Sequence, residues 1–494
     1  MSMPINPLNA VLTVRELAEA DRMAQAAGTG ETELMQQAGQ AVAQAIIRRW
    51  TPRMVVVLCG PGGNGGDGLV AARCLADAGW TVRIALLGSR ESLAGAAAVH
   101  AQRLTGALEP LAPAALTGAA LVVDALYGAG LRGRVEGIAE ETLVAAAQSG
   151  VPLVAIDVPS GVLGDTGESL GAVAAALTVT FVRKKPGHLL EPGRSLCGEV
   201  VVADIGISAA ILAGILPTML ENAPSCWQRA VPQLRQAGNK YHRGHALISG
   251  GYPQTGAARL AARAAARVGA GLTTIAVPDP AAPIYASSLI SIMVHPLQAH
   301  EDFNCLLDDP RYSAVLIGPG SGVSEETRAR VLAMLGSGRP IVLDADALTA
   351  FAGNPAELDW AISGPCILTP HEGEFQRLFD ATGDKITRAR AAARCSGAII
   401  VLKGRDTVIA SPDGRVIINS NAPATLATAG SGDVLSGLIL GLLAQGMEPH
   451  LAAAAGVWMH GAAADAFGPG LMSEDLPDLV PGVLRRLIRR AAEA

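Results

Sequence analysis

The sequence predicts an α/β protein of two domains, each built on a parallel β-sheet with helices on both faces. Short apolar runs rich in Val, Ile and Leu alternate with Ala-rich helical segments along the whole chain, as they do in successive β-α-β units. A chain of 494 residues is also too long for one hydrophobic core, and this length suggests about two to four domains.

Composition and charge argue against several classes of function. The net charge is -6 and the Lys and Arg residues are scattered, which does not suit a nucleic-acid-binding surface. The seven cysteines are widely spaced without a C-x-x-C pair, which favours reduced thiols in a cytoplasmic protein. We expect neither a signal peptide nor a membrane span, because the start of the chain lacks a basic region and no apolar run reaches about 18 residues.

The first half begins with two predicted helices and a strand that leads into a glycine loop. Thr13 is expected to cap a helix over 14–25, and Thr32 a second helix over 33–50. The run Met54–Cys59 is continuously apolar, as in a buried parallel strand, and it continues into the loop GPGGNGGDG and a helix. A strand, a glycine loop and a helix in this order can hold the phosphates of a dinucleotide. Further strands are predicted over 81–87, 120–123 and 152–156.

Polar side chains follow three of these strands. Asn64 and Asp67 lie in the glycine loop, Asp124 ends the next central strand, and Asp157 and Ser160 follow the one after it. Because ligands of open α/β sheets bind beyond the carboxyl ends of the strands, we expect these side chains to converge on one crevice. Their oxygens suit a hard cation, a general base, or both. The alternative is that each aspartate only caps a helix or orders a turn.

A domain boundary is expected within residues 206–230, where apolar alternation is lost and Pro217 and Pro224 interrupt the chain. We therefore place the two domains at 1–215 and 225–494. Predicted strands of the second domain again end in glycines or polar residues, among them Gly318, Gly320, Gly322, Asp344, Asp346, Thr369, His371, Glu374 and Lys403. This pattern predicts a ligand-binding rim on a packed core.

Two features of this rim have open alternatives. In the segment KGRDT, Lys403 and Arg405 can neutralise nucleotide phosphates and the Gly404 amide can add a hydrogen bond. The same segment also suits an ordinary hairpin with solvated charges. His371, taken alone, is predicted to be a buried histidine whose hydrogen bonds are satisfied.

The segment Gly430–Asp433 opens a helix whose apolar residues recur at helical spacing, with Gly446 as its C-cap. Unpaired N–H groups and the helix dipole favour an anion at such a start, and glycine lets a phosphate approach the backbone. A carboxylate beside an anion is unfavourable unless it accepts a proton or meets a metal, so Asp433 is a candidate catalytic base. The alternative is that Asp433 only caps the helix.

The ordered motifs resemble a known pair of domains. CGPGGNGGDG, VDALYGAGL and DVPSG, within residues 1–215, resemble the NAD(P)HX epimerase domain, which is Rossmann-like. GGYPQTGAA, GPGSG, LDADAL, LTPHEGEF, VLKGRDT and AGSGDVLSG, within 225–494, resemble the ribokinase-like NAD(P)HX dehydratase domain. Their order is similar to that of the bifunctional nicotinamide nucleotide repair enzymes of bacteria.

The resemblance implies a site in each domain. In the first domain, the hydrated cofactor would contact Gly63, Asn64, Gly65, Gly66, Asp67, Gly128, Ala129, Gly130, Leu131, Arg132, Gly133, Arg134 and Asp157, and a potassium ion would be held by Asn64, Asp124 and Ser160. In the second, the hydrated cofactor would contact Ala257, Gly320, His371 and Asp433, and the adenine nucleotide would be held by Lys403, Gly404, Arg405, Asp406, Thr407 and Gly432. Gly63 stands where the family usually carries an asparagine.

The resemblance also implies the chemistry. Asp433 would take the proton of the C6 hydroxyl of hydrated NADH or NADPH as that hydroxyl attacks ADP, with Mg²⁺ on the phosphates. Asp157 would act as acid or base in interconverting the R and S epimers. We expect a homo-oligomer whose partners are the small molecules NADHX, NADPHX and ADP, with no nucleic acid and no membrane.

Three other classes of function fit parts of the sequence. The glycine-rich helix start also suits a small-molecule kinase fused to a non-catalytic nucleotide-binding module. The first half could be a nucleotide sensor. A redox dehydrogenase is disfavoured, because the first loop lacks the usual glycine spacing and an acidic residue placed for a ribose.

Overall fold

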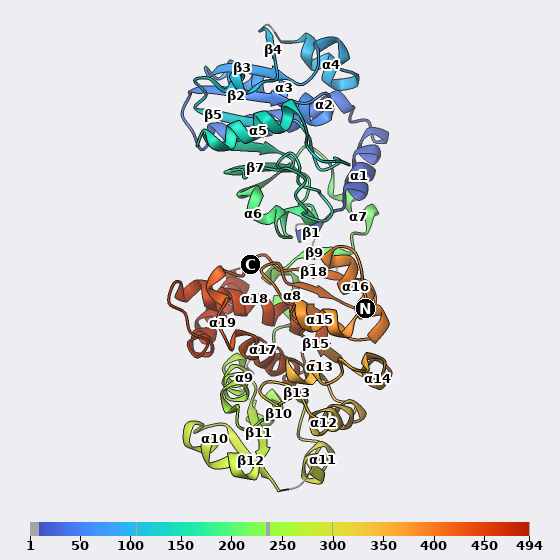
Figure 1. Cartoon of the computed structure of the whole chain (residues 1–494), viewed down its shortest axis with the longest axis vertical. Coiled ribbons are helices and arrows are strands. Elements are labelled where there is room, and N and C mark those ends of the chain that lie inside the picture. The colour runs from blue at the N-terminus through green and yellow to red at the C-terminus, as the bar shows by residue number, and fades with distance from the viewer. Residues whose placement is uncertain (1–8, 105, 234–237, 299, 494) are drawn as a thin grey trace. The chain divides into compact units, whose positions relative to one another are not determined.

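The computed structural model describes residues 9–104, 106–233, 238–298 and 300–493. The chain divides into two compact units, Met1–Leu220 and Glu221–Ala494. Each unit is an α/β structure with a mainly parallel sheet between layers of helices (Figure 1), which confirms the predicted fold class.

The sheet of the N-terminal unit is parallel throughout, in the order β4-β3-β2-β5-β6-β7-β8. Its strands are β2 (Met54–Cys59), β3 (Thr81–Leu86), β4 (Leu108–Pro110), β5 (Leu121–Ala125), β6 (Leu153–Ile156), β7 (Leu177–Phe181) and β8 (Glu199–Ala203). The central strands are buried along their length, so the sequence shows them as unbroken apolar runs.

Alternate residues of β2 face opposite sides of this sheet. Val55 and Val57 pack in one core cluster with residues of α2 and α3, whereas Val56 and Leu58 pack in another with residues of α5. The helices of this unit are α1 (Val14–Ala26), α2 (Glu31–Ile47), α3 (Gly63–Asp77), α4 (Gly95–Gln102), α5 (Ile138–Gln148), α6 (Gly193–Cys197) and α7 (Ala209–Ile215). Two separate cores on the two faces make the unit a three-layer structure.

One of the two predicted N-caps is confirmed and the other is wrong. The Thr13 hydroxyl accepts a hydrogen bond from the Glu16 amide, and the Glu16 carboxylate accepts one from the Thr13 amide, which completes a capping box. Helix α2 begins earlier than predicted, with Gly30 as its N-cap residue and no side-chain cap. Thr32 lies inside the first turn, where the backbone is already helical.

The sheet of the C-terminal unit has the order β18-β17-β16-β15-β14-β13-β10-β11-β12. Its strands are β10 (His245–Ser249), β11 (Leu272–Pro278), β12 (Met293–Leu297), β13 (Ala314–Ile317), β14 (Ile341–Leu343), β15 (Cys366–Leu368), β16 (Ile399–Leu402), β17 (Val408–Ala410) and β18 (Val416–Ile418). β17 is antiparallel to its two neighbours, β16 and β18, and the other neighbouring strands are parallel. The short strands β1 (Ala10–Val11) and β9 (Met219–Glu221) pair antiparallel.

Helices lie on both sides of this sheet, with α9, α17 and α18 on one side and α12, α14 and α16 on the other (Figure 1). The longer helices are α9 (Thr255–Val268), α12 (Glu325–Gly336), α16 (Lys385–Ser396), α17 (Ser431–Ala444), α18 (Pro449–Phe467) and α19 (Leu476–Glu493). The shorter ones are α8 (Pro224–Trp227), α10 (Ala282–Ser288), α11 (His300–Asp308), α13 (Asp346–Thr349), α14 (Pro355–Ala361) and α15 (Glu372–Leu378). Within the described ranges, no helix combines the length and the apolar character needed to span a membrane.

Helix α17 is held against α9 by close backbone contact. A Cβ atom on Gly437 would lie 2.2 Å from the Ala261 carbonyl oxygen, and one on Gly441 would lie 2.6 Å from that of Ala265. The glycines therefore let the backbones of the two helices approach closely. The helix ends at Ala444, and Gly446, with φ +84°, closes it as predicted.

Candidate active sites

The start of α17 is not capped by any side chain. Gly430 is its N-cap residue, in the left-handed conformation with φ +85°, and Asp433 is the third residue of the helix. The alternative in which Asp433 caps this helix is therefore wrong. Glycine is required at 430 by its conformation and by space, since a Cβ atom there would lie 2.9 Å from Leu260 Cδ1. An uncapped helix start built on glycines leaves main-chain N–H groups for an anion.

The surroundings of Asp433 bring its titration close to neutral pH. Burial is the largest cause that raises its pKa, to about 7, and the nearby carboxylates of Asp344, Asp346 and Glu374 add to the rise. The ammonium group of Lys403 opposes them. We call these five residues the C-terminal rim. Because its pKa lies near the working pH, Asp433 can both take up and release a proton there.

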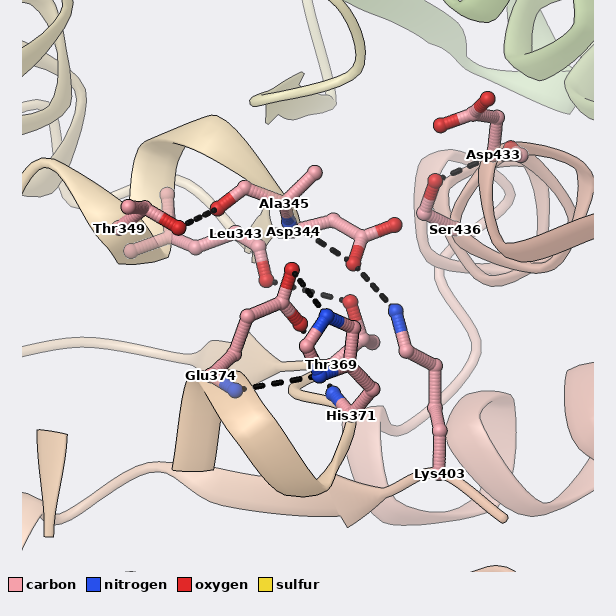
Figure 2. Close-up of polar contacts among 10 residues, drawn as sticks. All are labelled: Leu343, Asp344, Ala345, Thr349, Thr369, His371, Glu374, Lys403, Asp433 and Ser436. Carbon is pink, nitrogen blue, oxygen red and sulfur yellow. Dashed lines mark hydrogen bonds and ion pairs between the residues drawn. The ribbon is translucent and has the colours of Figure 1, made fainter. Parts of the chain in front are cut away.

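Lys403 forms an ion pair with Asp344 that the sequence analysis did not predict. Its Nζ lies 2.7 Å from Asp344 Oδ1, and a Cβ atom on Gly432 would lie 3.4 Å from the same nitrogen. Figure 2 shows the Lys403 side chain reaching toward the Asp344 carboxylate, with Asp433 beyond it on α17. The pair is buried, so the alternative of solvated charges is wrong for Lys403. Residues 403–407 do form the turn between antiparallel β16 and β17.

His371 is exposed, so its interpretation as a buried histidine is wrong. It is the N-cap residue of α15, and its Nδ1 accepts a hydrogen bond from the Glu374 amide at 3.1 Å. The Glu374 carboxylate accepts one from the His371 amide at 2.8 Å. His371 follows Pro370 with an extended backbone, and 56% of its side chain is exposed. The Nε2 edge of the ring can therefore meet a ligand.

The other residues expected in this site lie at neighbouring strand ends. Ala257 lies in the first turn of α9, and Gly320, with φ +68°, lies in the loop after β13. A Cβ atom on Gly251, after β10, would lie 1.6 Å from the Gly320 carbonyl oxygen, so the two loops touch. The Thr407 hydroxyl closes the turn at 403–407, because it accepts a hydrogen bond from the Gly404 amide and donates one to the Gly404 carbonyl oxygen.

In the N-terminal unit, Asp124 and Ser160 form one buried cluster at the ends of β5 and β6. The Ser160 hydroxyl donates to Asp124 Oδ1 at 2.6 Å, and the Ser160 amide donates to Oδ2 at 2.8 Å. Burial raises the pKa of Asp124, and these hydrogen bonds partly offset that rise. The Asn64 amide nitrogen is buried without a hydrogen-bond partner in the described part of the chain.

Asp157 lies next to this cluster. A Cβ atom on Gly128 would lie 3.0 Å from Asp157 Oδ2 and 3.4 Å from Asn64 Oδ1, so these groups face the same loop. The Ala129 amide donates to Asp157 Oδ2 at 2.9 Å. Burial acts to raise the pKa of Asp157, but the charge and hydrogen bond of Lys185 outweigh it and leave the pKa lowered. Asp157 is therefore ionised at neutral pH and suits a base. We call Asn64, Asp124, Asp157 and Ser160 the N-terminal crevice.

Asp67, in the first turns of α3, has the opposite environment. Burial, followed by the charges of Asp157 and Asp21, raises its pKa well above the ordinary value. It lines a cavity of about 200 Å³ together with Gly63 and Asp21. A Cβ atom on Gly63 would meet nothing within 4 Å, so the missing side chain leaves open space.

Two family models match the chain along separate stretches. The model described as "YjeF-related protein N-terminus" matches residues 31–187, and the model of NAD(P)H-hydrate dehydratase matches residues 245–478. The bifunctional NAD(P)H-hydrate repair enzyme of Coxiella burnetii is 37% identical over 94% of this chain and 96% of its own length. That of Moorella thermoacetica is 38% identical over 97% of each.

The chain belongs to the bifunctional NAD(P)H-hydrate repair enzymes. The resemblance stated from the motifs is confirmed, and the two units are the epimerase half and the dehydratase half that this family joins. A ribokinase-like superfamily protein of Enterococcus faecalis is 23% identical, covers 55% of this chain and 96% of its own, and has a TM-score of 0.50, which confirms the ribokinase-like fold.

Sequence reasoning missed two partners in this repair enzyme. The partner of Lys403 is Asp344, which is 59 residues away, and the partner of Asp157 is Lys185, 28 residues away. The available signal for the second was the polar run RKKPGH, residues 183–188, which follows β7. No group of three or more His, Cys, Asp or Glu side chains placed to hold a metal occurs among the residues that the structure describes.

Proposed function

We propose that the C-terminal unit uses ADP as phosphoryl donor to dehydrate the S epimer of hydrated NADH and NADPH through a phosphorylated intermediate. We further propose that the N-terminal unit interconverts the R and S epimers. These activities are assigned to residues 225–494 and 1–215. The observation that carries the proposal is Asp433, a carboxylate with a pKa of about 7 beside Lys403 at an uncapped helix start.

In the dehydratase step, Asp433 takes the proton of the C6 hydroxyl while that oxygen attacks the β-phosphorus of ADP. A C–O–P bond forms, the bond between the two phosphates breaks, and AMP leaves. The ring nitrogen then expels inorganic phosphate from C6, and loss of a proton from C5 restores the dihydropyridine. Main-chain N–H groups at Gly432 and its neighbours stabilise the charge that develops on the phosphoryl oxygens. Lys403 to Thr407 hold the rest of the nucleotide.

Mg²⁺ fits this step. When bound to the phosphate oxygens it would neutralise their charge, and the phosphates would supply much of its coordination. His371 and the backbone of Gly320 contact the hydrated cofactor from the loops beside the C-terminal rim. Ala257 contacts it from the first turn of α9.

In the epimerase step, Asp157 takes the proton of the C6 hydroxyl, on the side of the Gly128–Arg134 loop, while the bond between C6 and the ring nitrogen breaks and the nitrogen gains a proton. Closure of the ring on the other face of C6 reverses both proton transfers and gives the other epimer. Asn64, Asp124 and Ser160 supply amide, carboxylate and hydroxyl oxygens, a donor set that suits a hard cation such as potassium. The buried Asn64 side-chain nitrogen, which has no hydrogen-bond partner in the described part of the chain, supports a ligand with an acceptor oxygen at this position, because buried polar groups are otherwise paired. The cation would order the loops that carry these three residues.

A single assay tests both activities. The full chain is given mixed R and S hydrates, ADP, Mg²⁺ and K⁺, and the return of reduced cofactor is measured by its absorbance. We expect complete return, because the S form is consumed while the R form is epimerised. Return of only the S fraction would contradict the epimerase, and a stable phosphorylated product would favour the small-molecule kinase.

Replacing Ser160 with alanine should weaken epimerisation on the order of 10-fold or more and reduce its dependence on K⁺. The variant loses the hydroxyl oxygen and its bond to Asp124. The measurement is the rate of conversion of pure R hydrate at several K⁺ concentrations. Unchanged dehydration of the S hydrate by the same chain shows that the protein is otherwise intact, whereas an unchanged K⁺ response would contradict the proposed ligand set.

A further inference from the structure

We propose that Lys185 and His188 are positioning residues of the epimerase, which hold the Asp157 carboxylate ionised and aimed at the ligand loop. Both lie in the segment that follows β7, and neither was expected from the sequence. The inference rests on the proposed function of the N-terminal unit, and it adds the residues through which Asp157 acts.

The Lys185 side chain is buried, with 1% of it exposed, and it is directed at Asp157. Its Nζ lies 2.6 Å from Asp157 Oδ1 and 3.0 Å from the Thr180 hydroxyl on β7. Thr180 Oγ1 also lies 3.3 Å from Asp157 Oδ1. A buried ammonium group needs a charge partner and hydrogen-bond acceptors, and Asp157 and Thr180 provide them. Lys185 thus occupies one oxygen of the carboxylate and leaves the other, Oδ2, facing Gly128 and Ala129.

His188 fixes the backbone of the same aspartate. Its Nδ1 accepts a hydrogen bond from the Lys185 amide at 2.9 Å, so its Nε2 carries the proton and donates to the Asp157 carbonyl oxygen at 2.7 Å. Burial, and then the charge of Lys185, lower the pKa of His188 to about 4, so the ring stays neutral. One imidazole therefore ties the backbone of Lys185 to that of Asp157.

The backbone of Asp157 is strained. Its φ is +70°, in the left-handed region that a residue with a Cβ rarely occupies. Hydrogen bonds hold this conformation. The Asp157 amide donates to the Val179 carbonyl oxygen at 2.8 Å, and His188 donates to the Asp157 carbonyl oxygen. Lys185 and the Ala129 amide donate to the Asp157 carboxylate. A strained backbone conformation persists where several surrounding contacts hold it in place, and such residues are concentrated at functional sites.

The charged groups within electrostatic reach of Asp157 come from three elements. Lys185 and His188 follow β7, Asp67 lies on α3, and Asp21 lies on α1. The charge of Asp157 adds to the rise in the pKa of Asp67 and of Asp21, and Lys185 is the group whose charge most favours ionisation of Asp157. Without Lys185, burial would act on the Asp157 carboxylate without its main opposing charge, so the pKa of Asp157 would rise.

The test compares Lys185→Gln with Lys185→Arg, Thr180→Val and the matched control Lys184→Gln in the full chain. Lys184→Gln removes the same charge one position away. Conversion of pure R hydrate is followed without ADP, by separating the two epimers. We expect Lys185→Gln to lower kcat by about 100-fold with KM changed less than about threefold, and to move the acidic limb of the pH profile upward. Lys185→Arg should recover part of the rate, and Lys184→Gln should match the parent.

The thermal transition and the dehydration of S hydrate by the same chain report on folding. If Lys185→Gln does not fold, Thr180→Val, which removes only a hydroxyl contact, should still lower kcat severalfold and move the same limb. A folded Lys185→Gln with kcat within threefold of the parent, or an effect on KM alone, overturns the inference. Full activity of Asp157→Asn would instead overturn the proposed function, so the two failures are distinguishable.

Discussion

Replacing Asp433 with asparagine should abolish the ADP-driven return of reduced cofactor from the S hydrate. We expect a loss of roughly 100-fold or more, because the amide cannot take the hydroxyl proton at the start of α17. In the parent chain the rate should rise with pH through about 7, where Asp433 ionises. The measurement is the initial rate of absorbance recovery with pure S hydrate between pH 5.5 and pH 9, a range that spans the expected transition by about 1.5 units or more on each side.

The same variant should be more stable than the parent above neutral pH. Since the folded-state pKa of Asp433 is raised from 3.8 to about 7, the folded protein binds this proton more tightly than the unfolded chain does. That contribution to stability is complete at low pH and is lost as the pH rises through about 7. At pH 8 the asparagine variant avoids the buried charge, which should raise the free energy of unfolding by up to about 4 kcal/mol.

Asp465→Asn is the matched control, because Asp465 is exposed near the end of α18. It should change neither the rate nor the pH dependence. A folded Asp433→Asn with near-normal turnover would contradict the role of Asp433 as base. Loss of activity together with loss of stability at pH 8 would contradict the raised pKa of the Asp433 carboxylate.

Replacing Lys403 with methionine should destabilise the C-terminal unit by about 3–5 kcal/mol. The substitution leaves the buried Asp344 carboxylate without its ion-pair partner, and an uncompensated buried charge is costly. Burial alone would lower the pKa of Lys403, but Asp344 and the other rim carboxylates raise it. The ion pair therefore contributes to stability at neutral pH, and this contribution is lost only above about pH 10. Urea unfolding, followed by tryptophan fluorescence, measures the difference.

The double variant Lys403→Met, Asp344→Leu separates stability from activity. Removal of both charges should restore most of the lost stability, since a buried pair replaced by apolar residues is often neutral. Activity should remain at least about 10-fold below the parent, because the rim has lost the cation that faces the start of α17. In the single variant, the pH at which the rate rises should also move upward, since Lys403 lowers the pKa of Asp433. A single variant as stable as the parent would contradict the pairing.

Local features of the fold could be predicted because their causes are local. The strand β2 is buried on both faces, so its six apolar residues identify it without any knowledge of its neighbours. Thr13 and Glu16 complete a cap within four residues. The predicted start of α2 was wrong because Gly30 and Thr32 are both acceptable N-cap residues, and packing of the helix decides between them.

The sequence by itself determined the alternation of strands and helices, the two glycine-rich helix starts and, through its ordered motifs, the family. Only the tertiary structure decided which charges meet. Asp433 becomes a base near neutral pH because three other strand ends place Asp344, Asp346, Glu374 and Lys403 around it in a buried rim. Asp157 stays ionised because the segment after β7 buries Lys185 against it. Electrostatic coupling depends on distance and burial through space, and neither can be read from spacing along the chain.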